Sequence, residues 1–223
     1  MNLMDVLDRE MYTEAEAARL LRMPGGTLRY WLEGGTRGRR TYAPILREQA
    51  TGSRFVTWGE FVEAGLLRQY RKDLRVPMTE MRAFIEGLRG RFAVPYPLAH
   101  FRPLTSGQDL VIEAQDVAGL APEFQLVAEV KNQYVLLPAA DAFLRRVEYK
   151  DDVAVQWRPQ EELRVVFDPR RRFGAPTIEG VSTHALWEAV DSGEEEAVVA
   201  SLYQLSISDV KQALAYEIAS QAA

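Results

Sequence analysis

The sequence predicts an α+β protein with a helical N-terminal part, a short β-rich middle segment and a helical C-terminal part. Apolar residues recur at helical spacing over residues 12–32 and 59–88, β-branched runs replace that pattern between about residues 110 and 167, and helical spacing returns after residue 183. With 223 residues, the chain can form one large domain or two to three small ones, and 47% hydrophobic content is enough to build their cores. The expected domains are residues 1–94, 95–160 and 161–223.

The N-terminal part contains the order of elements that is typical of a helix-turn-helix. Thr13 and Glu16 stand three residues apart, as in a capping box, so a helix is expected over residues 12–23. Pro24-Gly25-Gly26 then ends this helix, because proline cannot continue the hydrogen-bond pattern and glycine accepts positive φ. A second helix is predicted over residues 27–32, and Gly34-Gly35 is expected to end it. Such a pair of helices can dock in a DNA groove.

A basic loop over residues 36–54 follows the two helices. It holds too many arginines for a core and has a turn signal at Thr51-Gly52-Ser53, so a β-hairpin wing is expected, with residues 55–58 as its second strand. Residues 19–54 carry eight arginines and two glutamates, a net charge of +6. Arginines on such a wing can pair with DNA phosphates.

Two motifs occur together in this region. Thr27-Leu28-Arg29-Tyr30-Trp31 is followed by Gly34-Gly35, and Arg54-Phe55-Val56-Thr57 precedes the next helix. In order and spacing they resemble the winged helix of MerR-type regulators, in which recognition-helix and wing residues contact bases and phosphates. The wing is longer here. By this resemblance and by charge, the expected DNA contacts are Thr27, Arg29, Tyr30, Arg37, Arg39, Arg40 and Arg54.

Strand-like runs rich in β-branched residues fill the middle segment; they are residues 110–112, 124–130, 134–137, 147–157 and 163–167. Lys131-Asn132-Gln133 suits a hairpin turn between two of these runs. A small antiparallel sheet of roughly four or five strands is therefore expected. Such a sheet can seat a partner or build a dimer, and its sequence selects neither.

A second pattern covers about fifty residues near the C-terminus. It consists of Asp168-Pro169, a Gly-x-Pro-x-Ile-x-Gly run at residues 174–180, Glu194-Glu195-Glu196, Tyr203, a Leu-Ser-x-x-Asp-Val turn at residues 205–210 and Ala-Leu-x-Tyr at residues 213–216. In order and spacing this pattern resembles a small prokaryotic domain of unknown function that occurs in VapB-type antitoxins. It departs after Gly180, where Val181-Ser182-Thr183 replaces the usual Thr-Arg.

Three short helices with a helix-turn-helix order are expected after residue 183, and Ser208 is a suitable N-cap for the last of them. Residues 173–223 carry eight acidic side chains and one lysine, a net charge of −7. DNA phosphates would repel such a surface, so this unit is expected to bind protein; an ordinary solvated acidic face is the alternative. The expected partner contacts are Arg170, Arg171, Arg172, Glu194, Glu195, Glu196 and Tyr203. The resemblance to antitoxins also implies an arginine that enters the acidic active site of a toxin, and either residues 170–172 or Arg145-Arg146 could supply it.

The composition argues against several kinds of chemistry. The chain has no cysteine, and its two histidines, His100 and His184, have no second ligand at useful spacing, so no metal site, cofactor or catalytic residue is expected. The sequence has no run of eighteen apolar residues and its N-terminus is polar and acidic, so a cytoplasmic protein without membrane association is expected. An enzyme such as a nuclease or hydrolase is the least supported hypothesis.

The two resemblances together imply a DNA-binding antitoxin of a type II toxin-antitoxin system. Such a protein would bind operator DNA as a homodimer, repress its own operon and neutralise a PIN-type ribonuclease toxin. The alternative is a stand-alone MerR-like transcriptional regulator whose β segment binds a small ligand. An adjacent gene for a PIN-like nuclease would favour the first hypothesis.

Overall fold

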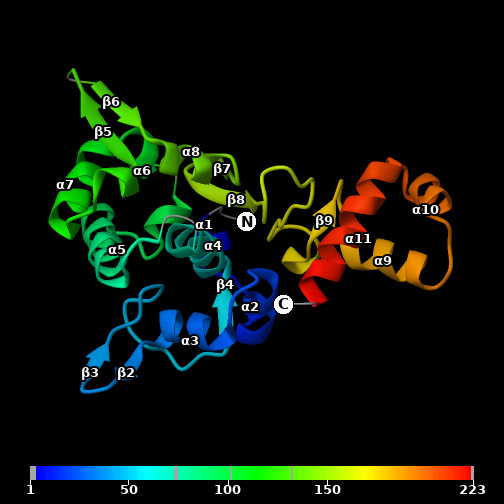
Figure 1. The fold of residues 1–223 in the computed structure, drawn as a ribbon, viewed down its shortest axis with the longest axis horizontal. Coiled ribbons are helices and arrows are strands. Elements are labelled where there is room, and N and C mark those ends of the chain that lie inside the picture. Colours follow the sequence, from blue (N-terminus) through cyan, green and yellow to red (C-terminus); the bar gives the residue numbers. More distant parts are fainter. Residues whose placement is uncertain (1–3, 73–74, 101, 132, 222–223) are drawn as a thin grey trace.

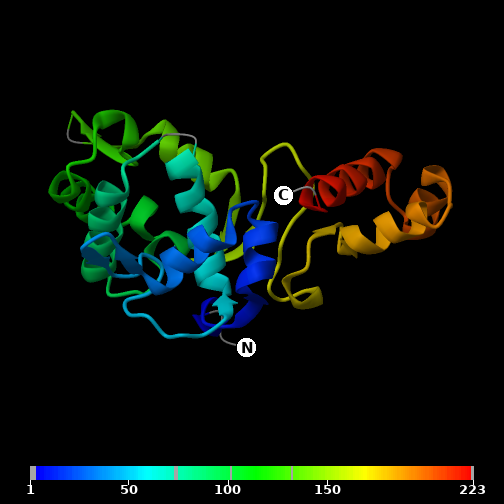
Figure 2. The ribbon, with the colours of Figure 1, turned by 60° about the horizontal axis from the view of Figure 1, so that its bottom comes forward.

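The computed structural model describes residues 4–72, 75–100, 102–131 and 133–221. In these ranges the chain folds into helices and five two-stranded antiparallel sheets, so the predicted α+β class is confirmed. Figures 1 and 2 show a larger body and a smaller lobe, which the orange and red C-terminal helices form. Buried apolar side chains make one connected core that extends from Val6 to Tyr216.

The N-terminal part begins with α1 (Met4–Leu7), β1 (Glu10–Thr13), α2 (Glu14–Leu20) and α3 (Gly25–Glu33). Thr13 caps α2, since its hydroxyl accepts a hydrogen bond from the Glu16 amide at 3.2 Å. The helix is shorter than predicted because residues 10–13 pair as a strand and Arg22 has left-handed backbone, with φ of 51°. Gly34 ends α3 with φ of 71°, where a Cβ would clash with the Tyr42 carbonyl oxygen.

The basic hairpin exists, but its turn and its second strand differ from the prediction. It consists of β2 (Gly35–Arg37) and β3 (Arg40–Tyr42), and the chain reverses at Gly38-Arg39 instead of Thr51-Gly52-Ser53. β4 (Phe55–Thr57) is not a wing strand, because it pairs with β1. Val56 lies opposite Tyr12 in that pair, and burial of both side chains in the core favours this pairing.

The helical spacing predicted over residues 59–88 is confirmed, and it belongs to two helices, α4 (Trp58–Lys72) and α5 (Met78–Phe92). Phe61 of α4 lies in an aromatic cluster, with its ring centre 4.6 Å from Tyr12, 5.3 Å from Trp157 and 5.5 Å from Phe167. Phe167 in turn contacts Tyr216 at 6.2 Å. These rings connect the N-terminal part to the C-terminal lobe.

The middle segment is not one sheet. β5 (Val127–Val130) pairs with β6 (Gln133–Leu136), and β7 (Val147–Lys150) pairs with β8 (Val153–Trp157), but no ladder joins the two hairpins in the described part of the chain. The hairpin predicted around residues 131–133 is confirmed by the pairing of Val130 with Gln133, although Asn132 lies outside the described residues. The single sheet of four or five strands is therefore wrong.

Helices account for much of the rest of this segment. They are α6 (Arg102–Thr105), α7 (Gln108–Ala118), α8 (Pro138–Leu144) and two 3-10 turns, η1 (Pro97–Ala99) and η2 (Pro122–Phe124). Residues 110–112, predicted as a strand, belong to α7, because Val111 and Ala114 are buried at helical spacing and α7 packs against α5. Residues 163–167 make isolated bridges, from Val166 to Thr177 and from Phe167 to Trp157.

The three predicted C-terminal helices are confirmed. After η3 (Arg172–Gly174) and a small hairpin of β9 (Thr177–Ile178) and β10 (Val181–Ser182) come α9 (Thr183–Asp191), α10 (Glu196–Tyr203) and α11 (Ile207–Gln221). The cap of α11 differs from the prediction, because Ser208 lies inside the first turn and Ser206 precedes it. The Ser206 hydroxyl accepts from the Asp209 amide at 3.1 Å, and the Asp209 carboxylate accepts from the Ser206 amide at 3.2 Å.

Candidate nucleic-acid interface and an adjacent pocket

Helix α3 divides its side chains between the core and solvent. Leu28, Trp31 and Leu32 are buried, whereas the Arg29 side chain is 62% exposed and lies 3.6 Å from the Glu14 carboxylate. Thr27 is half-buried near the start of the helix. Of the predicted DNA contacts on this helix, Arg29 is therefore the most accessible one.

The Tyr30 side chain extends from α3 to the basic hairpin. Its ring meets Tyr42 of β3 edge-on, with centres 6.3 Å apart, and the Arg82 guanidinium of α5 lies 5.2 Å from it. Arg82 also donates a hydrogen bond to the Ala43 carbonyl. These contacts anchor the hairpin to α3 and α5, so Tyr30 holds the hairpin in position even though the sequence suggested it as a direct DNA contact.

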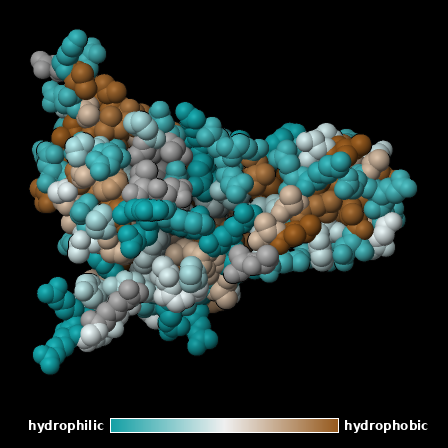
Figure 3. Space-filling view, in the orientation of Figure 1, coloured by the Kyte–Doolittle hydropathy of each residue, from teal (hydrophilic) through white to brown (hydrophobic). Residues whose placement is uncertain are grey.

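The hairpin and the residues before β4 display most of the predicted arginines. Arg39, Arg40 and Arg54 are exposed, and none of them forms an ion pair with the described residues; the Arg37 side chain lies outside that description. Figure 3 shows hydrophilic side chains projecting from the part of the molecule where Figure 1 places β2 and β3. Accessible guanidinium groups on a projecting hairpin suit phosphate contacts.

Arg47 plays a different part from the other arginines of this basic region. It is 7% exposed, and its Nε lies 2.6 Å from the Glu60 carboxylate, while its terminal nitrogens reach Glu33, Thr51 and the Phe55 carbonyl. Burial lowers the pKa of Arg47, but hydrogen bonds and charge from Glu60 and Glu33 outweigh it and raise the pKa above its ordinary value. Arg47 thus fixes the loop behind the hairpin.

The three consecutive arginines of the C-terminal pattern are anchored to different degrees. Arg170 holds the buried Asp168 through two hydrogen bonds of 2.8 Å, and Arg172 donates to the Gly180 carbonyl at 3.1 Å. Burial raises the pKa of Asp168, but hydrogen bonds from Arg170 and Gln156 lower it below the ordinary range. The Arg171 side chain is 66% exposed, against 30% for Arg170.

The predicted acidic contacts lie at the start of α10. Glu194 and Glu195 are exposed, Glu196 lies 3.7 Å from the Lys211 ammonium, and Tyr203 is half-buried. The structure also exposes apolar residues here that the sequence reasoning missed; they are Val198, Leu202, Ile207 and Ile218. Figure 3 shows hydrophobic side chains gathered over α10 and α11. The sequence could have predicted this exposed apolar surface, since α10 has apolar residues on both of its faces.

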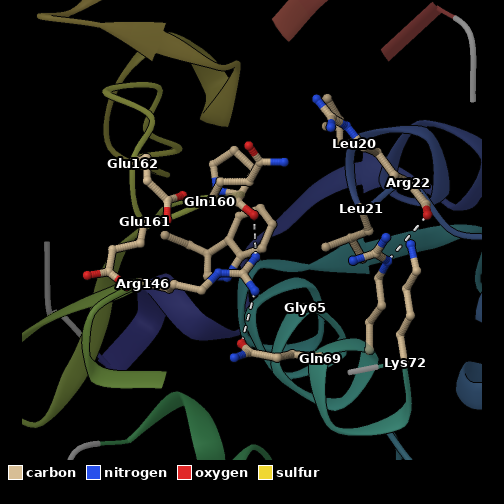
Figure 4. Close-up of a pocket in the computed structure, with 13 residues that line it drawn as sticks. Leu20, Leu21, Arg22, Gly65, Gln69, Lys72, Arg146, Gln160, Glu161 and Glu162 are labelled. Carbon is tan, nitrogen blue, oxygen red and sulfur yellow. Dashed lines mark hydrogen bonds between the residues drawn. The ribbon is translucent and has the colours of Figure 1, made fainter. Parts of the chain in front are cut away.

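A pocket of about 480 Å³ lies between the end of α2, one face of α4, and the chain around β8. Arg146 lies on one side of this pocket, where it donates to the Gln69 amide oxygen at 2.9 Å and to the Pro159 carbonyl at 2.6 Å. Its guanidinium also lies over the Trp157 ring at 5.1 Å. Arg145, the other arginine of this pair, lies 3.3 Å from Glu161. Figure 4 shows Glu161 on the same side of the pocket as Arg146. Sequence reasoning had not grouped these residues.

The fold and these surfaces define an α+β protein with an exposed basic hairpin beside α3 and an acidic three-helix lobe. Residues 165–216 match the family described as "Protein of unknown function (DUF433)". The chain is 36% identical over 226 residues to "Uncharacterized protein Rv2308" of Mycobacterium tuberculosis, with 97% of this chain and 93% of the relative covered. It is also 30% identical to "Putative antitoxin VapB45" of the same organism, with 78% of each covered.

These matches place the protein in the family of Rv2308 and VapB45. The X-ray structure of Rv2018 from Mycobacterium tuberculosis is similar, with a TM-score of 0.72, 26% identity, and 93% of this chain and 99% of that chain covered. The likeness extends over nearly the whole fold. None of the described helices is both long and apolar enough to span a membrane.

Proposed function

We propose that the protein is the antitoxin of a type II toxin-antitoxin pair, and that it binds operator DNA as a homodimer and neutralises a PIN-type ribonuclease in the cytoplasm. The match to the relative named as an antitoxin carries this proposal. That match covers 78% of the chain, so it includes residues of both the basic N-terminal part and the acidic C-terminal lobe.

The N-terminal part of the proposal assigns DNA binding to a winged helix-turn-helix of the MerR type. The α2–α3 pair, the projecting β2–β3 hairpin and the exposed Arg29, Arg39, Arg40 and Arg54 support it. Thr27 is assigned a contact at the start of α3, Arg37 is assigned a phosphate, and Tyr30 holds the hairpin at the spacing that the groove requires. Binding to the operon's own promoter would give autoregulation.

The C-terminal part of the proposal assigns toxin binding to the acidic lobe. Residues 173–223 have a net charge of −7, which disfavours DNA, and α10 and α11 expose apolar side chains between the acidic ones. Buried apolar contacts supply most of the affinity of a protein interface, and charge adds specificity. Glu194 and Glu195 precede α10 and Tyr203 ends it, so these three are candidate contacts on this surface. Arg171, whose side chain is 66% exposed, is a separate candidate contact before β9.

Co-expression with the nuclease encoded by the adjacent gene tests the proposal. The complex is expected to purify together, the nuclease is expected to lose ribonuclease activity in it, and growth arrest by the nuclease alone is expected to be relieved. The stand-alone regulator would instead be favoured if no adjacent gene encoded a nuclease. It would also be favoured if the adjacent nuclease stayed active in the presence of this protein.

A further inference from the structure

The pocket between α2, α4 and β8 gathers positive charge from segments far apart in the sequence. Arg22, Arg68, Lys72 and Arg146 line it, against the carboxylates of Glu161 and Glu162. Glu161 lies 3.3 Å from Arg145 and, in Figure 4, extends away from the α4 side chains. The interior of the pocket is therefore more positive than a count of its lining residues indicates.

Two residues that line this pocket each have a buried N–H donor without an acceptor among the described residues. The two donors are Nε of Arg22 and Nε1 of Trp157, and the Trp157 side chain is almost fully buried, at 2% exposed. A buried donor without an acceptor loses its hydration without compensation, so native structures seldom keep one unless a ligand, ion or water supplies the acceptor. Both nitrogen atoms carry N–H donors, so a partner for either one would have to be a hydrogen-bond acceptor.

Two of these cations, Arg68 and Arg146, are held in place before any ligand arrives. Arg68 and Lys72 stand one turn apart on α4, where like charges repel, and Arg68 is oriented by its hydrogen bond to the Arg22 carbonyl at 3.2 Å. Arg146 is fixed by its acceptors and by Trp157. An anion between these groups would relieve the repulsion, and Arg68 and Arg146 would need little further ordering to bind it.

We propose that this pocket binds a small organic polyanion with at least two phosphate or carboxylate groups. Two anionic groups are required because Arg146 and Lys72 lie on opposite sides of the pocket in Figure 4. Leu20, Leu21 and Trp157 add apolar lining for the body of the molecule. A volume of about 480 Å³ suits a ligand of metabolite size.

The position of the pocket would connect such a ligand to both ends of the protein. Arg22 lies in the turn between α2 and α3, and its guanidinium is 5.6 Å from the centre of the Tyr216 ring on α11. Gln160 and Glu161 lie just before the family-matched residues 165–216. A bound polyanion would thus contact the segments that position α3 and the C-terminal lobe.

Isothermal titration of the full chain tests this site, with inorganic pyrophosphate and citrate as the phosphate and carboxylate probes. We expect saturable binding of at least one probe, weakened about tenfold by Lys72→Gln because this variant removes one charge-assisted hydrogen bond. Arg71→Gln is the matched control, because it removes the same charge from the preceding residue of α4, which does not line this pocket. This control is expected to change affinity by less than about twofold.

The outcomes separate the possible occupants. Stronger binding of pyrophosphate or of citrate identifies the phosphate or carboxylate class. Equal weakening by Lys72→Gln and Arg71→Gln would show general charge attraction and overturn the proposal, as would no saturable heat at millimolar probe. If Lys72→Gln weakened duplex DNA binding and left both probes unaffected, the pocket would belong to the DNA surface and the proposal would fail. Lys72 is exposed, so loss of folding is not expected.

Discussion

Arg47 shows how one buried cation can organise a basic region. It holds Glu60 and Glu33 with little solvent contact, so Arg47→Met would leave both carboxylates without their partner. We expect the free energy of unfolding to fall by about 3–5 kcal/mol. Urea unfolding measures this, and the exposed Arg40→Met should change it by less than about 0.5 kcal/mol. Equal effects of the two variants would contradict the assigned role.

Glu63 is a buried carboxyl whose burial raises its pKa to about 8, against a weaker lowering effect of Arg89 at 3.9 Å and the Leu98 amide at 3.2 Å. The folded protein therefore holds a proton that the unfolded chain releases near 4.5, and its stability should decline as pH rises from 4.5 to 8. Glu63→Gln should remove this dependence. The stability difference between variant and native protein should favour the variant increasingly up to pH 8; a constant difference in denaturant titrations would contradict this.

At the scale of elements, the arginines of the β2–β3 hairpin and of the chain before β4 should bind DNA phosphates. Replacing Arg39, Arg40 and Arg54 with alanine should weaken operator binding and lower the slope of log affinity against log salt by roughly 1 for each phosphate that is no longer neutralised. Fluorescence anisotropy over a salt series measures both quantities. Arg145→Ala, which removes an exposed arginine that pairs with Glu161 in the middle segment, serves as control. An unchanged slope would exclude the hairpin from the interface.

Helix α10 should carry the contact with the nuclease toxin. Leu202 is 72% exposed, so Leu202→Glu should leave the fold intact and reduce toxin binding at least tenfold by placing a charge in an apolar contact. Val117→Glu matches it, because Val117 is 74% exposed on α7. Surface plasmon resonance with the nuclease compares them. Normal binding by Leu202→Glu would exclude this face and leave the antitoxin proposal standing, whereas no binding by the native protein would contradict the antitoxin proposal itself.

At the scale of the whole molecule, the aromatic cluster should make the larger body and the C-terminal lobe unfold together. Phe167 is fully buried and contacts Phe61, Trp157 and Tyr216. Phe167→Ala should lower the free energy of unfolding by about 3–5 kcal/mol. Tryptophan fluorescence and far-ultraviolet circular dichroism should report one shared transition in the native protein. Two separate transitions in the native protein would show that the lobes unfold independently.

Prediction from sequence succeeded where the signal was local. The Thr13–Glu16 cap, Gly34 at the end of α3, and the apolar spacing of α4, α5 and α9 to α11 involve neighbours within a few residues, and these elements are present. The exposed hairpin arginines of the candidate site also follow from a local excess of charge. The pocket could not be predicted from local sequence, because Arg22, Lys72 and Arg146 belong to segments that meet only in the folded chain.

By itself, the sequence determined the α+β class, the helical ends, the position of the basic and acidic regions, and the C-terminal family pattern, since each depends on composition or short-range spacing. Tertiary structure alone decided that residues 110–112 are helical, that β4 pairs with β1, and that Arg47 is buried. The physical reason is shared: short apolar runs and single charges suit several environments, and their partners come from distant segments. Packing against α5 favours the helix at residues 110–112, and burial beside Tyr12 favours the pairing of β4 with β1. The carboxylates of Glu33 and Glu60 hold Arg47 in its buried position.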